Sequence, residues 1–201
     1  MSVVEAYKQN LQECYTNIME ESERTGGAKK DIVGRQYEDF RVRCITRHEQ
    51  LDVATPEEVK LFKKELGGKY NADQYIVDRA SRKLLALEED KGHYVDKCFA
   101  KRAVINAMET IALCVKKNVD VPYFLLSCPT NYDIESLLDD LGGIFNERSF
   151  SILGDKLKFF PLCDHGRTSR DKYLKDSVMP FQLSNQRIVE ENSFLANLGV
   201  S

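Results

Sequence analysis

The sequence predicts an α+β protein, with a helix-rich N-terminal two-thirds followed by a small α/β head that contains a β-hairpin. Apolar residues recur every three or four positions as far as residue 117, which is typical of amphipathic helices. A short apolar run follows at 121–126, and two alternating runs flank a Gly-Asp pair at 154–155. With 42% apolar residues, the 201-residue chain can build a core of ordinary size.

The first region, 1–54, is expected to be helical. It opens with an amphipathic helix at 3–23, which Gly26-Gly27 ends. The basic stretch 28–54 fits two structures. Tyr37, Phe40 and Cys44 can share one face of a helix, whereas Phe40, Val42 and Cys44 can alternate along a strand. We favour the helix.

The second region, 55–119, reads as a series of basic amphipathic helices. Thr55-Pro56-Glu57-Glu58 predicts a helix start, because the threonine can cap, proline suits the first turn and Glu58 completes a capping box. That helix stops at Gly67-Gly68. A second helix, capped by Asn71 or Asp73, runs to Gly92 with four apolar residues on one face: Ile76, Ala80, Leu84 and Leu87. The clearest helical pattern covers 94–117.

The third region, 120–201, is the predicted head with its polar tail. It begins with a strand at 121–126, closed by Pro129, and continues with a short helix from Asp133 to Leu141. Strands at 149–153 and 156–160, on either side of Gly154-Asp155, form the predicted hairpin. Residues 164–176 are polar and are expected to form a loop.

Composition and motifs favour a protein that is not an enzyme and that needs no cofactor. The chain has no phosphate-binding, dinucleotide-binding, zinc-protease or nucleophile-elbow motif, and only three histidines. Six scattered cysteines are expected to be free thiols, and Cys163 with His165 lacks the further ligands that zinc needs. The runs Glu88-Glu89-Asp90 and Asp139-Asp140 are interpreted as solvated helix faces or ends.

The same features place the protein in the cytoplasm, since neither a signal-peptide h-region nor an apolar stretch long enough to cross a membrane is present. The formal net charge of −3 argues against a protein that coats nucleic acid all over its surface. It does not exclude a local basic face.

Clustered cations supply the predicted binding residues. At the spacing i, i+3, i+4, Arg79, Arg82 and Lys83 would share one face of a helix, where each can meet a phosphate. The neighbouring predicted helices also carry adjacent basic residues. The complete predicted set for RNA is Lys63, Lys64, Arg79, Arg82, Lys83, Lys101 and Arg102.

Three strings in this part of the chain resemble one family. They are E-V-K-L-F-K-K at 58–64, Y-I-V-D-R-A-S-R-K-L at 75–84 and K-R-A-V-I-N-A-M-E-T at 101–110. In order and approximate spacing they are similar to non-structural protein eight of coronavirus-type replicases, a cofactor of the viral RNA polymerase, and fit a distant nidovirus relative. The resemblance implies that the cations contact duplex RNA leaving the polymerase and that the head docks on the polymerase.

The resemblance also implies a protein partner for the apolar stripe Ile105, Met108, Ala112 and Val115, either a small helical subunit or a second copy. Our first hypothesis is therefore a non-catalytic, sequence-independent RNA-binding accessory subunit of a viral RNA polymerase, located at replication complexes. The second is a helical adaptor that binds only proteins. A third, a winged-helix DNA binder that uses 133–141 and 149–160, is disfavoured by its acidic reading helix.

Overall fold

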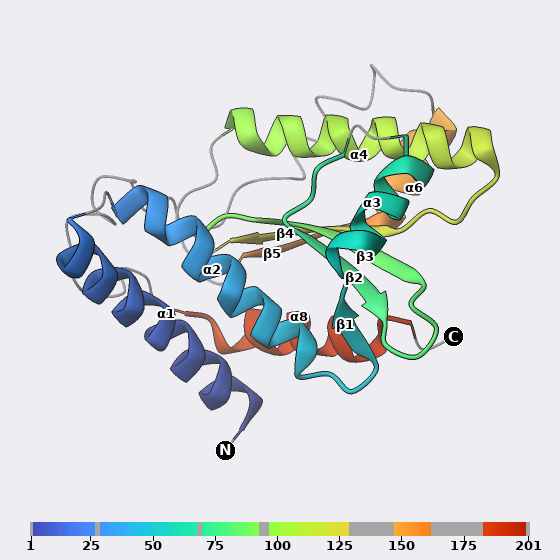
Figure 1. Cartoon of the computed structure of the whole chain (residues 1–201). Helices are drawn as coiled ribbons and strands as arrows, with labels where there is room; N and C mark the ends of the chain where they lie inside the picture. The colour runs from blue at the N-terminus through green and yellow to red at the C-terminus, as the bar shows by residue number, and fades with distance from the viewer. Residues whose placement is uncertain are drawn as a thin grey trace.

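The computed structural model describes residues 2–26, 29–67, 70–92, 97–128, 147–161 and 183–199. A five-stranded mixed sheet forms the centre of the molecule, with α4 on one face and α2 and α8 on the other (Figure 1). The strands are β1 (Leu51–Val53), β2 (Gln74–Asp78), β3 (Leu84–Asp90), β4 (Tyr123–Cys128) and β5 (Leu157–Pro161). The helices are α1 (Val3–Thr25), α2 (Lys29–Thr46), α3 (Pro56–Glu65), α4 (Lys97–Lys117), α6 (Glu147–Lys156) and α8 (Asn185–Asn197).

The strands lie side by side in chain order, but their directions change midway through the sheet. β1, β2 and β3 are antiparallel neighbours, whereas β3, β4 and β5 run parallel. The parallel step from β3 to β4 requires a crossover, which α4 provides. Consequently the carboxyl ends of β3, β4 and β5 meet at one edge of the sheet, and the start of β2 lies at that same edge.

Most of the predicted helices are confirmed. The amphipathic pattern at 3–23 forms α1, and the basic stretch after Gly26 forms α2, so the helical alternative for Tyr37, Phe40 and Cys44 is the right one. At the start of α3, Thr55 and Glu58 make the expected reciprocal capping box. The clearest pattern, at 94–117, corresponds to α4.

The predicted helix between Asn71 and Gly92 is wrong, because this stretch forms β2 and β3. Its apolar residues happened to recur at helical spacing, but Tyr75, Ile76 and Val77 favour a strand. A tight turn joins the two strands. The Asp78 carboxylate accepts hydrogen bonds from the backbone and hydroxyl of Ser81 at 2.6 and 2.7 Å, and Arg82 has a φ of +57°.

The predicted hairpin at 149–160 is half wrong. Its first strand and the Gly154-Asp155 pair belong to α6, whereas its second strand is confirmed as β5. The predicted strand at 121–126 is confirmed as β4, two residues later in the chain. The predicted helix 133–141, Asp139-Asp140, the Cys163–His165 pair and the loop 164–176 lie outside the described residues.

The apolar face of α4 packs on the sheet instead of facing a partner. Met108 is 3% exposed inside the core, and Val115 packs against the same core cluster. Ile105 is half-buried and Ala112 is exposed, so the four predicted partner-binding residues do not form one free surface. All three predicted regions contribute strands to the single sheet.

Four of the six cysteines are buried free thiols: Cys14, Cys44, Cys114 and Cys128. Burial raises the pKa of Cys14 and of Cys44 to about 12, so neither is a reactive thiolate. Among the described helices, none has the length and apolar character to span a bilayer.

Candidate functional site

Two acidic residues lie where β2 and β3 separate. In the antiparallel register Gln74 pairs with Glu88, so Asp73, which directly precedes β2, and Glu89 of β3 occupy the next positions beyond this pair. Like charges directly opposite each other in a sheet cost stability. An arrangement of this kind is typical of a site that binds a cation.

Hydrogen bonds to β3 hold Asp73 in place. Its backbone N–H donates to the Glu88 carbonyl at 2.9 Å, and its Oδ2 accepts from the Asp90 N–H at 2.7 Å. Asp73 as a whole residue is exposed. Partial burial of its carboxyl nevertheless raises the pKa of Asp73, and the hydrogen bond from the Asp90 N–H and the charge of Lys91 oppose this rise. This aspartate is therefore fixed beside β3 and still accessible.

Glu89 lies on the face of β3 that α4 covers. Its burial and the neighbouring Asp73 raise its pKa from 4.5 to about 7, although the charges of Lys91 and Arg102 oppose the rise. A carboxyl with a pKa near neutrality gains or loses its proton readily at physiological pH. This is a common property of groups that act on substrates or bind metal ions.

Lys91 and Glu38 complete the group. Lys91 follows β3 directly, and its backbone N–H donates to the Ser127 carbonyl at 2.9 Å, which ties it to the carboxyl end of β4. Burial raises the pKa of Glu38, on α2, with Asp73 adding to the rise and Lys91 opposing it. We call Glu38, Asp73, Glu89 and Lys91 the acid–lysine cluster.

The donor set suits a hard divalent cation. Mg²⁺ prefers carboxylate oxygens and is commonly held by one or two carboxylates together with waters and substrate phosphates. Asp73 and Glu89 would be those two ligands, because they occupy neighbouring positions beyond the last β2–β3 pair and Asp73 influences Glu89 electrostatically. Within the described residues no three His, Cys, Asp or Glu side chains form a closed metal cage, so substrate oxygens would complete the shell.

Behind the cluster, on the opposite face of β3, lies a fully buried ionic network. The Arg41 guanidinium, with 0% exposure, binds Glu88 through Nε and Nη2 at 2.7 and 3.3 Å. Its Nη1 binds the Tyr7 hydroxyl at 3.0 Å and forms an ion pair with Glu191 of α8. We call Tyr7, Arg41, Glu88, Asp90 and Glu191 the Arg41 network.

The seven predicted RNA-binding cations do not form one surface. Arg79, Arg82 and Lys83 lie in or beside the β2–β3 turn, at the far end of β3. Arg82 binds the carboxylates of Asp52 and Glu58, each at 2.7 Å, and Lys83 pairs with Asp120 at 2.7 Å. Glu89 of the acid–lysine cluster lies six residues beyond Lys83 along β3, which is roughly 20 Å.

The remaining predicted cations lie on helices. Lys101 and Arg102 are exposed in the first half of α4, and Arg102 interacts electrostatically with Glu89. On α3, Lys63 donates to the Asn71 side chain at 2.5 Å, two residues before Asp73, and Lys64 is exposed. The shared helical face predicted for Arg79, Arg82 and Lys83 is therefore wrong. By contrast, Lys63 binds Asn71, close to Asp73 in sequence, and Arg102 interacts electrostatically with Glu89.

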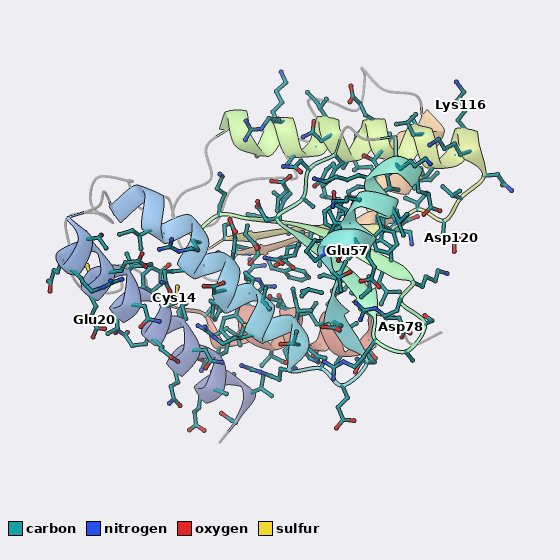
Figure 2. The ribbon with its side chains drawn as sticks, in the orientation of Figure 1. Cys14, Glu20, Glu57, Asp78, Lys116 and Asp120 are labelled. Carbon is teal, nitrogen blue, oxygen red and sulfur yellow. The ribbon has the colours of Figure 1, made fainter. Side chains whose placement is uncertain are left out.

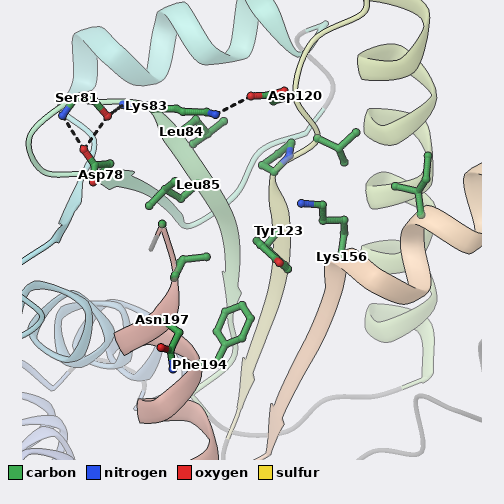
Figure 3. A pocket seen from close by; sticks show the side chains of 15 residues that line it. Asp78, Ser81, Lys83, Leu84, Leu85, Asp120, Tyr123, Lys156, Phe194 and Asn197 are labelled. Carbon is green, nitrogen blue, oxygen red and sulfur yellow. Dashed lines mark hydrogen bonds and ion pairs between the residues drawn. The ribbon is translucent and has the colours of Figure 1, made fainter. Parts of the chain in front are cut away.

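The turn end of the sheet carries its own cleft, of about 870 Å³ (Figure 3). Lys156 lies with its ammonium 4.2 Å from the centre of the Tyr123 ring, and the Lys83–Asp120 pair closes one side (Figure 3). The whole side-chain view places Asp78 and Asp120 at this same end (Figure 2). The charged side chains here neutralise one another, which leaves no excess charge to select an ionic ligand.

The acid–lysine cluster was missed in the sequence because Glu88-Glu89-Asp90 was interpreted as a solvated helix face or end. That interpretation is wrong, since Glu88 and Asp90 are buried in a central strand. A usable signal was present. An apolar run, Leu84-Leu85-Ala86-Leu87, leads directly into three acids and a lysine, and a run of this kind is typical of a buried strand that ends at a functional edge.

Comparison with known proteins adds no relative: no protein-family model, curated protein or solved structure matches the chain.

Proposed function

We propose that this protein is a metal-dependent hydrolase of nucleic-acid phosphodiester bonds. The observation that carries the proposal is the acid–lysine cluster at the sheet edge, where Asp73 and Glu89 occupy neighbouring positions beyond the last β2–β3 pair and Lys91 interacts electrostatically with both. The carboxyl ends of parallel strands are the usual place for a ligand in an open sheet. The cluster lies at that edge.

Each member of the cluster has a role in this chemistry. Asp73 and Glu89 would hold a divalent cation, which would supply Lewis-acid activation of the phosphate and of an attacking water. Lys91 stabilises the negative charge that develops on the phosphate oxygens, in the manner of a preorganised cation. Glu38, which interacts electrostatically with Asp73 and Lys91, would accept a proton from the attacking water, for which its raised pKa suits it.

A polymeric substrate explains the surrounding cations. Lys64, Lys101 and Arg102 are exposed on two helices, which spreads positive charge over a surface larger than one nucleotide. Contacts of this type neutralise backbone phosphates and carry no sequence information. The proposal thus keeps nucleic acid as the ligand that the cations predicted.

The non-catalytic role beside a viral polymerase remains a prediction. The rigid basic helix that it required between Asn71 and Gly92 is absent, because this segment forms two strands and a turn. Two of its cations, Arg82 and Lys83, are paired with carboxylates. The geometry favours hydrolysis at the other edge of the sheet.

The test measures metal binding and cleavage separately. Mg²⁺ and Mn²⁺ are titrated calorimetrically into the intact chain, and circular duplex DNA, single-stranded DNA and duplex RNA are incubated with each metal or with EDTA. We expect metal binding, and cleavage of at least one substrate that EDTA abolishes. Asp73→Asn and Glu89→Gln should each lower both metal affinity and cleavage by at least 100-fold, while Lys91→Ala should lower cleavage alone.

Matched controls come from the opposite edge of the sheet. Asp120→Asn and Lys83→Ala remove an exposed ion pair there, and both variants should cleave as the wild type does. The proposal fails if the wild-type protein binds neither metal at millimolar concentration. It also fails if cleavage persists in Asp73→Asn.

A further inference from the structure

The Arg41 network has an unusual charge balance for a protein interior. One guanidinium meets three carboxyl groups, those of Glu88, Asp90 and Glu191, and all four side chains are at most 1% exposed. Replacing such a buried set with apolar residues is often neutral or stabilising, so stability alone does not account for it. A different reason for these residues is needed.

The position of the network relative to Glu89 supplies that reason. Glu88 and Asp90 flank Glu89 in sequence, and side chains alternate along a strand, so both point away from the face that carries Glu89. Arg41 holds Glu88 with two hydrogen bonds and lies 3.9 Å from the Asp90 carboxylate. Contacts on the face opposite Glu89 therefore hold Glu88 and Asp90 at the carboxyl end of β3.

The same end of β3 also fixes Asp73. The Asp90 backbone N–H donates to Asp73 Oδ2, and the Glu88 carbonyl accepts from the Asp73 N–H. Both proposed metal ligands thus depend on the path of β3 between Glu88 and Asp90. Arg41 and its partners determine that path from the opposite face.

Helices distant in sequence complete the network. Glu191 of α8 forms the ion pair with Arg41 Nη1 and accepts a hydrogen bond from Tyr7 of α1 at 2.8 Å. Burial, with Glu88 adding to it, raises the pKa of Asp90 well above the usual value. Arg41 makes its short contacts with Glu88 and Glu191, whereas the Asp90 carboxylate lies 3.9 Å from Arg41 Nε.

From these contacts we infer that Arg41, with Glu88 of β3 and Glu191 of α8, is a positioning device for the proposed metal site, and that the seating of α8 determines the geometry of Asp73 and Glu89. The inference rests on the proposed function. Residues that orient metal ligands from behind commonly change metal affinity or activity 10- to 100-fold when replaced.

The principal test removes the charges but keeps the packing. The variant Tyr7→Phe/Arg41→Met/Glu88→Leu/Glu191→Leu replaces four of the five network residues with apolar side chains of similar size and keeps Asp90. We expect a cooperatively folded protein whose melting temperature lies within a few degrees of the wild type, because the guanidinium and its two closest carboxylates are removed together. Its Mg²⁺ dissociation constant should rise and its turnover should fall, each at least 10-fold, while KM for nucleic acid changes less than 3-fold because the surface cations are intact.

A milder variant covers the case in which the fourfold change does not fold. Glu191→Gln keeps the size and the hydrogen-bond acceptor of the side chain but removes its charge, so the fold should persist. We expect Mg²⁺ to bind several-fold more weakly and the pH midpoint of cleavage to shift. A control on the surface, Arg35→Met/Glu21→Leu, removes an exposed ion pair between α1 and α2 and should alter neither quantity.

The outcomes separate this inference from the proposed function. If the wild-type protein binds no Mg²⁺ or Mn²⁺, the proposed function fails and the inference fails with it. If the wild type binds and cleaves, but either folded network variant keeps wild-type Mg²⁺ affinity and turnover, the Arg41 network is merely structural. In that case the proposed function stands and only the positioning role is overturned.

Discussion

At the scale of single residues, Glu89 shows how a strand residue departs from ordinary behaviour. A surface glutamate would be ionised throughout the neutral range, but burial beside Asp73 raises the pKa of Glu89 to about 7. The folded protein therefore binds a proton at this residue more tightly than the unfolded chain does. The charged form is unfavourable unless a cation joins it.

This difference predicts a pH-dependent stability. The pKa of Glu89 is about 7 in the folded protein and near 4.5 in the unfolded chain, so its ionisation lowers stability as the pH rises between those values. At pH 8 without metal, Glu89→Gln should be more stable than the wild type by about 1–3 kcal/mol. At pH 4 the difference should vanish. Urea unfolding followed by circular dichroism at the two pH values measures it, and equal stability at pH 8 would contradict the assigned pKa.

The same residue predicts the pH profile of the proposed activity. Below pH 7 a proton occupies Glu89 and competes with the metal, so cleavage should rise with pH through about 7. Because the metal and the proton compete for one carboxylate, a tenfold increase in Mg²⁺ should move the midpoint to lower pH. Initial rates across pH 5–9 at two Mg²⁺ concentrations test this. A midpoint that ignores Mg²⁺ would assign the titration to another group.

At the scale of elements, the sequence predicted helices correctly where local interactions determine the structure. It failed where pairing with distant strands determines the structure. The capping box at Thr55 and the amphipathic pattern of α4 are local, and both are confirmed. The segment of β2 and β3 is stabilised by pairing with β1 and β4, which no window of one sequence reveals. Its apolar spacing fitted a helix equally well.

The wrong helix prediction for β2 and β3 is also the reason why the sequence did not reveal the candidate site. With 71–91 taken as a helix, Asp73 is a capping residue and Glu89 belongs to a solvated helix end. As two antiparallel strands, the same residues become neighbours across the sheet. Part of the cation set survives the correction, because Lys63, Lys101 and Arg102 lie on helices in both descriptions.

The two groups of cations should differ in their effect on nucleic-acid binding. Lys101→Ala/Arg102→Ala removes two exposed charges beside the acid–lysine cluster and should weaken duplex binding about 10-fold at low salt. Arg79→Ala/Lys83→Ala removes the same number of charges at the far turn and should change affinity less than 2-fold. Filter-binding titrations with Ca²⁺ in place of Mg²⁺, over 50–200 mM salt, compare the two pairs. Equal losses would mean that the turn also contacts the substrate.

Arg82 belongs to the fold instead of the binding surface. Its guanidinium joins the carboxylates of Asp52 and Glu58, which ties the β2–β3 turn to β1 and to the start of α3. Arg82→Met should lower the free energy of unfolding by about 1–2 kcal/mol, because both carboxylates lose a charged hydrogen-bond donor. Duplex affinity should not change. Chemical denaturation and filter binding on the same preparation separate these two effects.

At the scale of the whole molecule, three segments that the sequence predicted as separate regions share one sheet. β1 comes from 1–54, β2 and β3 come from 55–119, and β4 and β5 come from 120–201. The Arg41 network crosses the same boundaries, since it joins α1, α2, β3 and α8. Neither the core nor the acid–lysine cluster belongs to one region alone.

This shared sheet predicts that the chain unfolds as one unit. Far-UV circular dichroism and the fluorescence of the nine tyrosines should give coincident thermal transitions for the intact chain. A fragment covering 1–119 should fail to fold, because β3 would lose its parallel neighbour β4 and Arg41 would lose Glu191, one of the carboxylates that bind it. The fragment 120–201 should also be unfolded alone, yet mixing the two should restore part of the helical signal. A fragment 1–119 that melts cooperatively on its own would show instead that the N-terminal helices and β1–β3 form an independent domain, and that the C-terminal segment only docks on it.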